Sequence, residues 1–468
     1  MSAHCAWFQG LQAMSDRISR TRWGGARTGI FDASGFFRVA ESDGVFWLVD
    51  PDGGRFLSKG VNTVSFDQDH VQNSSRVPYA EACVRKYGSE AVWRAAAGAR
   101  LAHWGVNTLG CWSDERVADA GSFGFAVTPN LDLGMSFAWE KHEASEEHAQ
   151  KFPDVFDSSF DRHVWNRAHE KCAARTDDQK ILGWFIDNEL RWGPDWRGSA
   201  ELLTLFLGLQ RTAPGRMAAI GWLRERYRDF AAFNAVWHAP AQSWETLDAT
   251  ERIEPPYRRL PIYQRDASQE DAANHADAAR GEFFASCDAF SALVGQRYFE
   301  TTCAAIRAAD ANHLILGSRF AYIPPPGVIE AAAQHCDVIS ANCYDFDARP
   351  IIDAYSGSGK ACLIGEFSFR STDSGLPNTN GAGPLVPTQA ERAVAYRRYA
   401  AAALSQPAIV GFHWFEHADQ PAEGRFDGEN SNFGIVTIND EVYEKLTQTM
   451  KSVNAEADAV HAAAGRTS

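Results

Sequence analysis

Apolar residues between positions 56 and 419 fall into short, nearly continuous runs that alternate with longer stretches of helical periodicity. Runs of this kind, rich in β-branched and aromatic residues, are typical of strands buried on both faces of a parallel sheet. Eight strands that alternate with helices predict an α/β fold of the (β/α)8 TIM barrel type rather than a doubly wound sheet. The predicted core strands are 56–65, 104–112, 123–133, 181–190, 313–320, 336–346, 360–370 and 408–419, and the clearest helices are 90–103, 160–175, 283–310 and 389–405.

Two segments depart from a simple barrel. Residues 36–65 contain alternating runs separated by the turn sequences SDG and PDGG, which predict an N-terminal β-meander whose last strand enters the barrel. About 120 residues separate Trp192 from His313, far more than one crossover needs. We therefore expect a helical insertion after strand four, at about 193–275. The expected domains are a lead-in (1–35), the catalytic barrel (36–450) and a C-terminal tail (451–468).

Polar and aromatic residues gather where the predicted strands end. In a (β/α)8 barrel the active site lies at the carboxyl ends of the strands. The collected residues include many amides, carboxylates and aromatics, and they contain no glycine-rich phosphate loop. They are Asn62, Asn107, Trp112, Asn130, Asp132, Asp187, Asn188, Glu189, Arg319, Asn342, Tyr344, Asp345, Glu366, Ser368, His413, Trp414 and Glu416.

Two glutamates stand out because each directly follows a strand that was identified independently. Glu189 ends strand four and Glu366 ends strand seven. With strands about 4.8 Å apart, their Cα atoms should lie about 14 Å apart across the barrel mouth. Two glutamate side chains that each reach about 4 Å inward would leave roughly 5–6 Å between the carboxyl groups, which is the separation of a retaining glycosidase.

Five segments together resemble the agarase-type members of the clan A glycoside hydrolases. They are FWLVDPDGGRFLSKGVN, GWFIDNELRWG, the spaced pair FNAVW and SW, LIGEFSFRSTDSGLPNT, and HWFEHADQPAEGRFDGENSNFG, and they spread over about residues 36–446. Members of that family are (β/α)8 enzymes with catalytic glutamates on strands four and seven. The resemblance therefore implies a β-glycoside hydrolase.

The same resemblance implies roles for five residues. Glu189 would be the acid/base and Glu366 the nucleophile. Asn188 would bind the sugar 2-hydroxyl group, Tyr344 would donate a hydrogen bond to the nucleophile, and Trp414 would form a floor beneath the sugar at the point of cleavage. A lead-in and a meander stand here where agarases of this type carry a large N-terminal β-sandwich, so we expect imported oligosaccharides rather than the polymer as substrate.

Other interpretations of these residues stay open. Glu189 and Glu366 could be structural ion-pair partners at the barrel rim, and Asn188 could be a turn or cap residue. Trp414 could belong to the barrel core. Further candidates for substrate binding at the strand ends are Asn62, Trp112, His413 and Glu416. The insertion tryptophans could stack on sugars, although helix packing explains them more simply; they are Trp192, Trp196, Trp222, Trp237 and Trp244.

The sequence HWFEH matches a zinc motif that works on a helix. Here it continues an apolar strand, on which His413 and His417 would lie about 13 Å apart, too far for one zinc ion. We therefore predict no metal and no cofactor.

Composition limits the partners. The formal net charge is −15, which argues against nucleic acid and against anionic membranes. Nine cysteines without a CxxC pair predict a reducing compartment. The first residues lack the pattern of a signal peptide, and no apolar run has the roughly 18 residues of a membrane span, so we expect a cytoplasmic protein.

Together these features predict a retaining β-glycoside hydrolase that cleaves β-linked, galactose-containing oligosaccharides through a covalent intermediate. The rival hypotheses are a non-catalytic carbohydrate-binding barrel and a metal-dependent hydrolase on the same fold. Whether the chain forms a homo-oligomer, which sugar and linkage it recognises, and whether it acts on chain ends all stay open.

Overall fold

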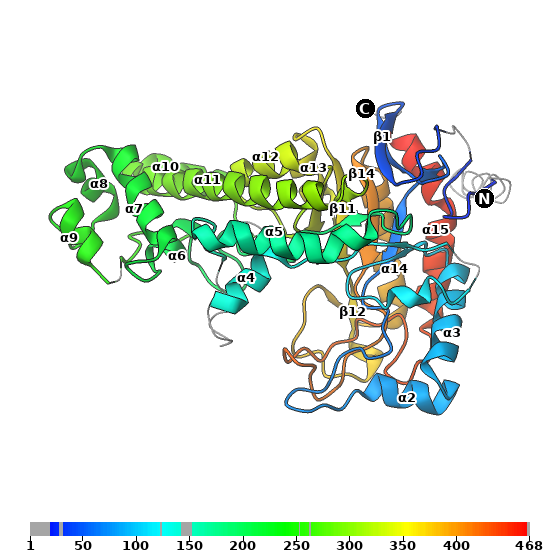
Figure 1. Ribbon diagram of the computed structural model, residues 1–468. Coiled ribbons are helices and arrows are strands. Elements are labelled where there is room, and N and C mark those ends of the chain that lie inside the picture. Colours follow the sequence, from blue (N-terminus) through cyan, green and yellow to red (C-terminus); the bar gives the residue numbers. More distant parts are fainter. Residues whose placement is uncertain are drawn as a thin grey trace.

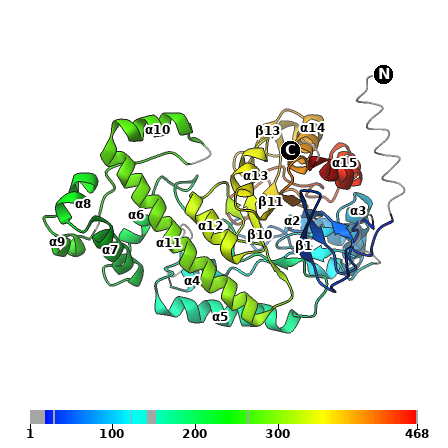
Figure 2. The ribbon, with the colours of Figure 1, turned by 90° about the horizontal axis from the view of Figure 1, so that it is seen from above.

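The computed structural model describes residues 19–27, 31–121, 124–141, 152–251, 253–261 and 264–465. A strand-containing body carries a long helical arm (Figure 1). The arm is built on α11 (Ala278–Ala309), with α5 (Ser158–Cys172) beside it and the shorter helices α6 to α9 at its far end (Figure 2). Most of the expected lead-in lies outside the described residues.

The body is organised around a parallel sheet of seven strands in the order β6-β5-β4-β14-β11-β10-β9. A separate parallel pair joins β7 to β8, and β1, β2 and β3 form the antiparallel meander. Each of the eight predicted core strands contains an observed one, although the hydrogen-bonded strands do not form one closed sheet within the described residues. The strands are β1 (Arg38–Ser42), β2 (Val45–Val49), β3 (Arg55–Phe56), β4 (Ser58–Val61), β5 (Thr108–Leu109), β6 (Ala126–Val127), β7 (Gly183–Trp184), β8 (Leu314–Ile315), β9 (Phe320–Ala321), β10 (Val338–Asn342), β11 (Ala361–Phe367), β12 (Arg370–Ser371), β13 (Leu385–Val386) and β14 (Ile409–Trp414).

Helices follow most of these strands in the chain, as the periodicity predicted. No helix within the described ranges combines the length and the apolar character that crossing a bilayer requires. Residues 451–464, assigned to a tail from the sequence, lie in the last helix, α15. The remaining helices are α2 (Pro78–Tyr87), α3 (Glu90–His103), α4 (Leu133–Lys141), α6 (Leu202–Leu207), α7 (Pro214–Tyr227), α8 (Phe230–Trp237), α9 (Trp244–Ala249), α10 (Ala267–Ala276), α12 (Pro326–His335), α13 (Arg349–Ser356), α14 (Gln389–Leu404) and α15 (Glu444–Ala464).

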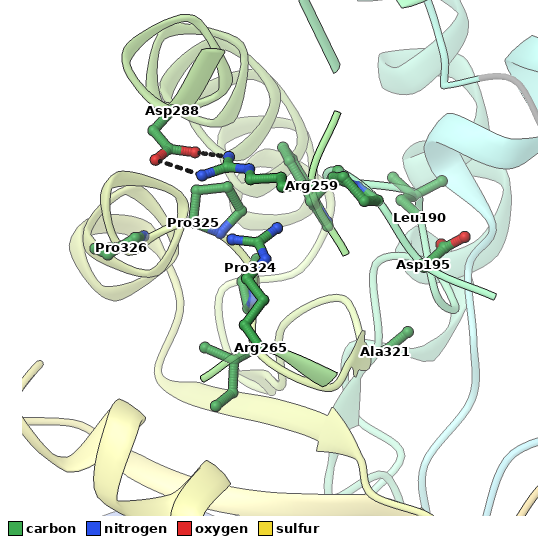
Figure 3. Close-up of a pocket in the computed structure, with 13 residues that line it drawn as sticks. Leu190, Asp195, Arg259, Arg265, Asp288, Ala321, Pro324, Pro325 and Pro326 are labelled. Atoms are coloured by element: carbon green, nitrogen blue, oxygen red, sulfur yellow. Dashed lines mark hydrogen bonds and ion pairs between the residues drawn. The ribbon is translucent and has the colours of Figure 1, made fainter. Parts of the chain in front are cut away.

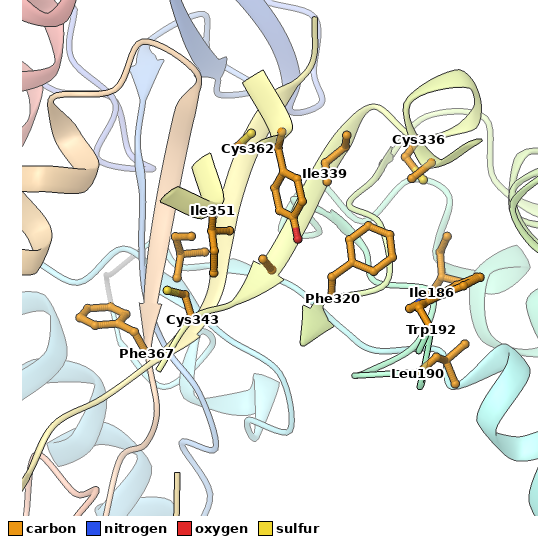
Figure 4. Close-up of a cluster of buried hydrophobic side chains, with 14 of the residues drawn as sticks. Ile186, Leu190, Trp192, Phe320, Cys336, Ile339, Cys343, Ile351, Cys362 and Phe367 are labelled. Atoms are coloured by element: carbon orange, nitrogen blue, oxygen red, sulfur yellow. The ribbon is translucent and has the colours of Figure 1, made fainter. Parts of the chain in front are cut away.

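Two hydrophobic clusters lie on opposite sides of the strands. The larger one fills the space between strands and helices and includes Cys343, Ile351 and Phe367 (Figure 4). The smaller one lies on the opposite face of the strands, and the meander contributes Phe37, Leu48 and Phe56 to it. The meander therefore covers the end of the strands opposite to the polar strand ends. All eight cysteines among the described residues are buried and free.

Asp440 ties the loop after β14 to the first helices of the body. Its carboxylate accepts hydrogen bonds from Arg100 at 2.7 and 2.9 Å, from Lys86 Nζ at 2.8 Å, and from the hydroxyl groups of Tyr79 and Tyr87 at 2.8 and 2.6 Å. The side chain is fully buried. Burial alone would raise the pKa of Asp440, but these partners, Arg100 above all, hold it well below its usual range.

We expect Asp440→Asn to lower the free energy of unfolding at pH 7 by roughly 3 kcal/mol, because it leaves Arg100 without its buried counterion. Since the folded-state pKa of Asp440 is depressed, its contribution is present at neutral pH and fades as the pH falls below about 4. Urea unfolding at pH 7 and pH 3.5 measures both effects. The exposed Asp43→Asn serves as control, and equal stability of the two variants at pH 7 would contradict this account.

Candidate active site

Five successive strand ends carry a non-glycine residue in the left-handed backbone conformation. Close after β4, β5, β6, β7 and β8, the φ angles of Thr63, Trp112, Asp132, Glu189 and Arg319 are 55°, 60°, 51°, 53° and 50°. Such angles are uncommon outside glycine and are found preferentially at functional sites, where the surrounding structure has to stabilise them. The backbone at these five polar strand ends is therefore held in a constrained conformation.

An irregularity in β11 turns Glu366 towards the interior. Leu363 belongs to the inner cluster and Ile364 to the outer one, so strict alternation would place Glu366 outside. The register with β14 shifts between Ile364 and Phe367, and Phe367 stacks outward on Tyr399 with ring centroids 4.3 Å apart. A local bulge of this kind re-aims a side chain. As a result Glu366 points inward and is only 4% exposed.

Two neighbours hold the Glu366 carboxylate. Arg319 Nη2 pairs with Oε1, and the Tyr344 hydroxyl donates to Oε2 at 2.6 Å. Arg319 is fully buried, and its guanidinium lies 5.0 Å from the ring centroid of Trp112 and 4.9 Å from that of Phe185. A buried carboxylate with two donors at fixed positions has essentially one orientation.

Glu189 belongs to the same hydrogen-bond network. Asn342 Nδ2 donates to Glu189 Oε1 at 2.8 Å and to Asn188 Oδ1 at 3.1 Å. Asn188 Oδ1 also accepts from Arg319 Nε at 2.7 Å. One arginine and two amides thus connect the two glutamates that the sequence singled out.

The close packing of this network requires glycine at position 365. A Cβ atom on Gly365 would lie 2.9 Å from Asn342 Oδ1 and 3.1 Å from Arg319 Nη1. Any side chain there would push apart the two donors that connect Glu189 with Glu366.

The two glutamates also interact through their charges. Burial raises the pKa of Glu189 to about 7, and the negative charge of Glu366 adds to the rise, while the hydrogen bond from Asn342 opposes it. The Glu189 side chain is nevertheless partly accessible. A reachable carboxyl group whose pKa lies near neutrality can both give and take a proton.

Asp187 has a raised pKa as well, but it has a structural position. It is fully buried, and its carboxylate accepts from the backbone N–H groups of Gly134 and Met135 at 2.7 and 2.9 Å and from the Tyr298 hydroxyl. Burial raises its pKa to about 7. Asp187 therefore fastens the start of α4 to the strand that ends in Glu189.

Trp112 and Asn62, both candidates for substrate binding, occupy different positions. Trp112 is 44% exposed, and its ring covers the guanidinium of Arg319. Asn62 is fully buried and bonds to the backbone of Gly365, Trp414 and Cys111. Trp112 therefore remains a candidate for substrate binding. The prediction that Asn62 binds substrate is wrong, because its side-chain amide is bonded to the backbone at the ends of three strands.

The prediction that Trp414 forms a floor beneath a sugar is wrong for this geometry. Trp414 is 1% exposed, donates its indole N–H to the carbonyl of Phe433 at 2.9 Å, and packs against Phe367 and Tyr396 on the helix side of β14. The alternative interpretation of Trp414 as a core residue is the one the structure supports. The aromatic ring next to the site belongs to Phe415, whose centroid lies 6.2 Å from that of Tyr344.

His413 and Glu416 are also too deeply buried to bind substrate as predicted. His413 is fully buried, bonds to the Ser58 hydroxyl at 2.8 Å, and has a pKa lowered to about 3 by burial and by the charge of Arg319. Glu416 is fully buried, and Gln420 donates to its Oε1 at 3.1 Å.

Burial raises the pKa of Glu416 well above its usual range. Because both are fully buried, His413 and Glu416 lie beneath the accessible surface of the site.

The two histidines of the HWFEH segment do not converge. His413 bonds to Ser58, whereas His417 packs edge-on against Tyr79 and Trp93. Within the described ranges, no three histidine, cysteine, aspartate or glutamate side chains are placed to share a metal ion.

Arg319 and Asn342 are the central residues that sequence reasoning did not select. Both were among the polar strand ends, so the same signal that identified Glu189 also contained them. Their importance depends on which strand ends lie opposite each other, and a strand-by-strand reading cannot supply that information.

Comparison with known proteins agrees with the motif resemblance. No family model matches the chain. Two curated relatives do: beta-agarase B and beta-agarase A of Vibrio sp. (strain JT0107) are 26% identical over 521 residues and 29% identical over 481 residues. The alignments cover 95% and 90% of this chain but 51% and 45% of the relatives, so the chain spans about half the length of the curated relatives it matches.

Solved structures of agarases share the fold. An exo-beta-agarase superimposes with a TM-score of 0.75 and 22% identity, covering 97% of this chain and 71% of that one. The agarase AgWH50C gives a TM-score of 0.73 and 23% identity, with 98% and 71% covered. The chain therefore resembles agarase-type glycoside hydrolases over nearly its whole length, as its motifs predicted.

We expect Glu366→Gln to lower the pKa of Glu189 from about 7, because the substitution removes a negative charge that disfavours ionisation and leaves Arg319 unpaired, while the effect of burial remains. Carboxyl ¹³C titration by NMR, with Glu189→Gln to assign the signal, measures the change. The exposed Asp345→Asn at the same edge is the control. An unchanged Glu189 pKa in Glu366→Gln would show that the two groups do not interact.

Proposed function

We propose that the chain is a retaining β-glycoside hydrolase that cleaves β-linked, galactose-containing oligosaccharides. The observation that carries the proposal is the network in which Arg319, Asn342 and Asn188 connect Glu189 with Glu366. Two carboxylic acids in unlike environments are what the two roles in glycoside hydrolysis require. The likeness to beta-agarases supports the choice of substrate.

The proposal includes a closed (β/α)8 barrel. Support comes from the parallel pairing of β14, the last strand, with β4, the first one after the meander. Parallel bridges between Val127 and Ile181 and between Asn130 and Phe185 extend the sheet from β6 towards β7. On the other side, the N–H of Asp337 donates to the carbonyl of Ile315 at 3.0 Å and connects β8 to the start of β10.

In the first step Glu366 attacks the anomeric carbon, and Glu189 gives its proton to the leaving oxygen. Arg319 and Tyr344 orient the attacking oxygen atoms. Once Glu366 is esterified by the sugar, its charge no longer raises the pKa of Glu189, which can then accept a proton from water in the second step. Hydrolysis of the ester returns both groups to their starting states.

Two further residues would contact the sugar. Asn188 keeps its Oδ1 engaged with Arg319 and Asn342, so its partly accessible amide group can donate to the 2-hydroxyl. Trp112 offers an exposed ring face directly above the arginine that holds the nucleophile. Aromatic faces of this kind pack against the apolar C–H side of a sugar ring.

Mass-spectrometric detection of cleavage across a panel of β-linked oligosaccharides, including agaro-oligosaccharides, tests the proposal. We expect wild-type protein and the surface variant Glu423→Gln to cleave at least one member. Glu366→Ala should be inactive, and Glu189→Gln should be slower by about 10²–10⁴-fold, the usual contribution of a general acid. Sodium azide should rescue Glu366→Ala and give the α-glycosyl azide.

Cleavage that survives in Glu366→Ala without azide would show that Glu366 is not the nucleophile. Binding of a sugar without cleavage by the wild type would favour the carbohydrate-binding barrel instead.

A further inference from the structure

A pocket lies beside the candidate active site, between the helical arm and the strand ends. The segment 190–195, directly after Glu189, forms one wall, and the segment 321–326, from the last residue of β9 to the first residue of α12, forms another. Arg259, Arg265 and Asp288 reach it from the arm (Figure 3). Its empty space is about 560 Å³, counted with the solvent at its mouth.

The two arginines of the pocket differ in how well they are paired. Arg259 is held by Glu201 at 2.7 and 3.1 Å and by Asp288, and its side chain is 7% exposed. Arg265 is 13% exposed, donates its Nε to the carbonyl of Leu260 at 2.5 Å, and has Glu270 at 3.6 Å. Among the described residues, neither Nη atom of Arg265 has a hydrogen-bond acceptor.

Burial and the charge of Arg259 lower the pKa of Arg265. Because only its Nε atom has a partner among the described residues, the guanidinium group of Arg265 has donors left for a ligand in the pocket.

The charges around the pocket balance. Arg191 and Arg197 face Asp195, while Arg259 and Arg265 face Glu201, Asp288 and Glu270. Four positive groups thus meet four negative ones, which favours a neutral ligand over an anion.

Such a ligand would need acceptors for Arg265, donors for Asp195 or Asp288, and an apolar side for Ile323 and Pro324. A sugar ring has all three, because each hydroxyl both donates and accepts while the C–H faces are apolar.

The position of the pocket next to Glu189 indicates which sugar unit of the substrate would bind there. In the proposed reaction Glu189 protonates the oxygen that departs with the leaving group, and the pocket wall begins at the next residue, Leu190. Asp195 of this wall accepts from Arg197 Nε at 2.9 Å, and Arg197 Nη2 donates to the Glu189 carbonyl at 2.9 Å. The loop that follows Glu189 therefore holds both Glu189 and the pocket wall in position.

We propose that this pocket is a subsite for a neutral sugar on the leaving-group side of the scissile bond, with Arg265 as its main hydrogen-bond donor. The inference rests on the proposed hydrolase function. It predicts that the pocket raises kcat/KM for oligosaccharides long enough to reach it, and not for substrates with a short leaving group.

The test compares kcat/KM for an aryl β-galactoside and for β-linked galactose-containing oligosaccharides of increasing length. Arg265→Met should lose about ten-fold on the long substrates and nothing on the aryl glycoside, as expected for one charged hydrogen-bond donor. Ile323→Trp, which fills the pocket without changing Arg265, should give the same pattern. Arg226→Met, on the arm but paired with Glu282 away from the pocket, is the matched control.

Three results would overturn the inference. These are equal losses of Arg265→Met on short and long substrates, no loss in either pocket variant, and a preference for a sulfated over a neutral sugar at that unit. Wild-type protein that cleaves none of the substrates would contradict the proposed function itself, and the subsite with it.

Discussion

The arrangement of the site depends on one buried guanidinium. Arg319 has no exposed surface, so its charge must be matched within the protein. Glu366 supplies the opposite charge, Asn188 accepts from its Nε, and the rings of Trp112 and Phe185 cover its faces. Because these partners come from several strand ends, satisfying Arg319 sets the relative positions of those strands.

The same requirement explains why the strand ends depart from regular geometry. Arg319 and Glu189 both adopt left-handed backbone angles, and the β11 register shifts so that Glu366 rather than Phe367 faces inward. Each departure is unfavourable when considered alone. Together they bring two carboxyl groups and an arginine into one hydrogen-bond network, with Gly365 allowing the close approach. The fold stabilises this arrangement through the two hydrophobic clusters and through anchors such as Asp440.

Much of the fold could be predicted because its signals are local. Continuous apolar runs located all eight core strands, and the periodicity of 90–103 and 389–405 located α3 and α14. Glu189 and Glu366 were found because each ends a strand. The hydrogen-bond network of the site was harder to predict from the sequence. Arg319 and Asn342 carry the same signal as their neighbours, and only the spatial order of the strands distinguishes them.

Four predictions of substrate binding failed, those for Asn62, His413, Trp414 and Glu416, because each residue was judged by its place at a strand end without the direction and burial of its side chain. On a strand, consecutive side chains point to opposite faces, so His413 inside requires Trp414 outside. The resemblance to agarases suggested an aromatic floor at Trp414, whereas the ring near Tyr344 is that of Phe415. For Asn62, a polar residue at a strand end was taken as a ligand contact, although three backbone partners occupy its amide.

We propose that Glu366 forms a covalent bond with the sugar while Arg319 and Tyr344 hold its carboxylate. Incubation of the wild-type protein with an activated 2-deoxy-2-fluoro-β-galactoside, followed by peptide mapping by mass spectrometry, tests this most directly. We expect one fluorosugar per chain, attached to Glu366. A label on another carboxylate, or turnover to the product of inverted configuration without any adduct, would contradict it.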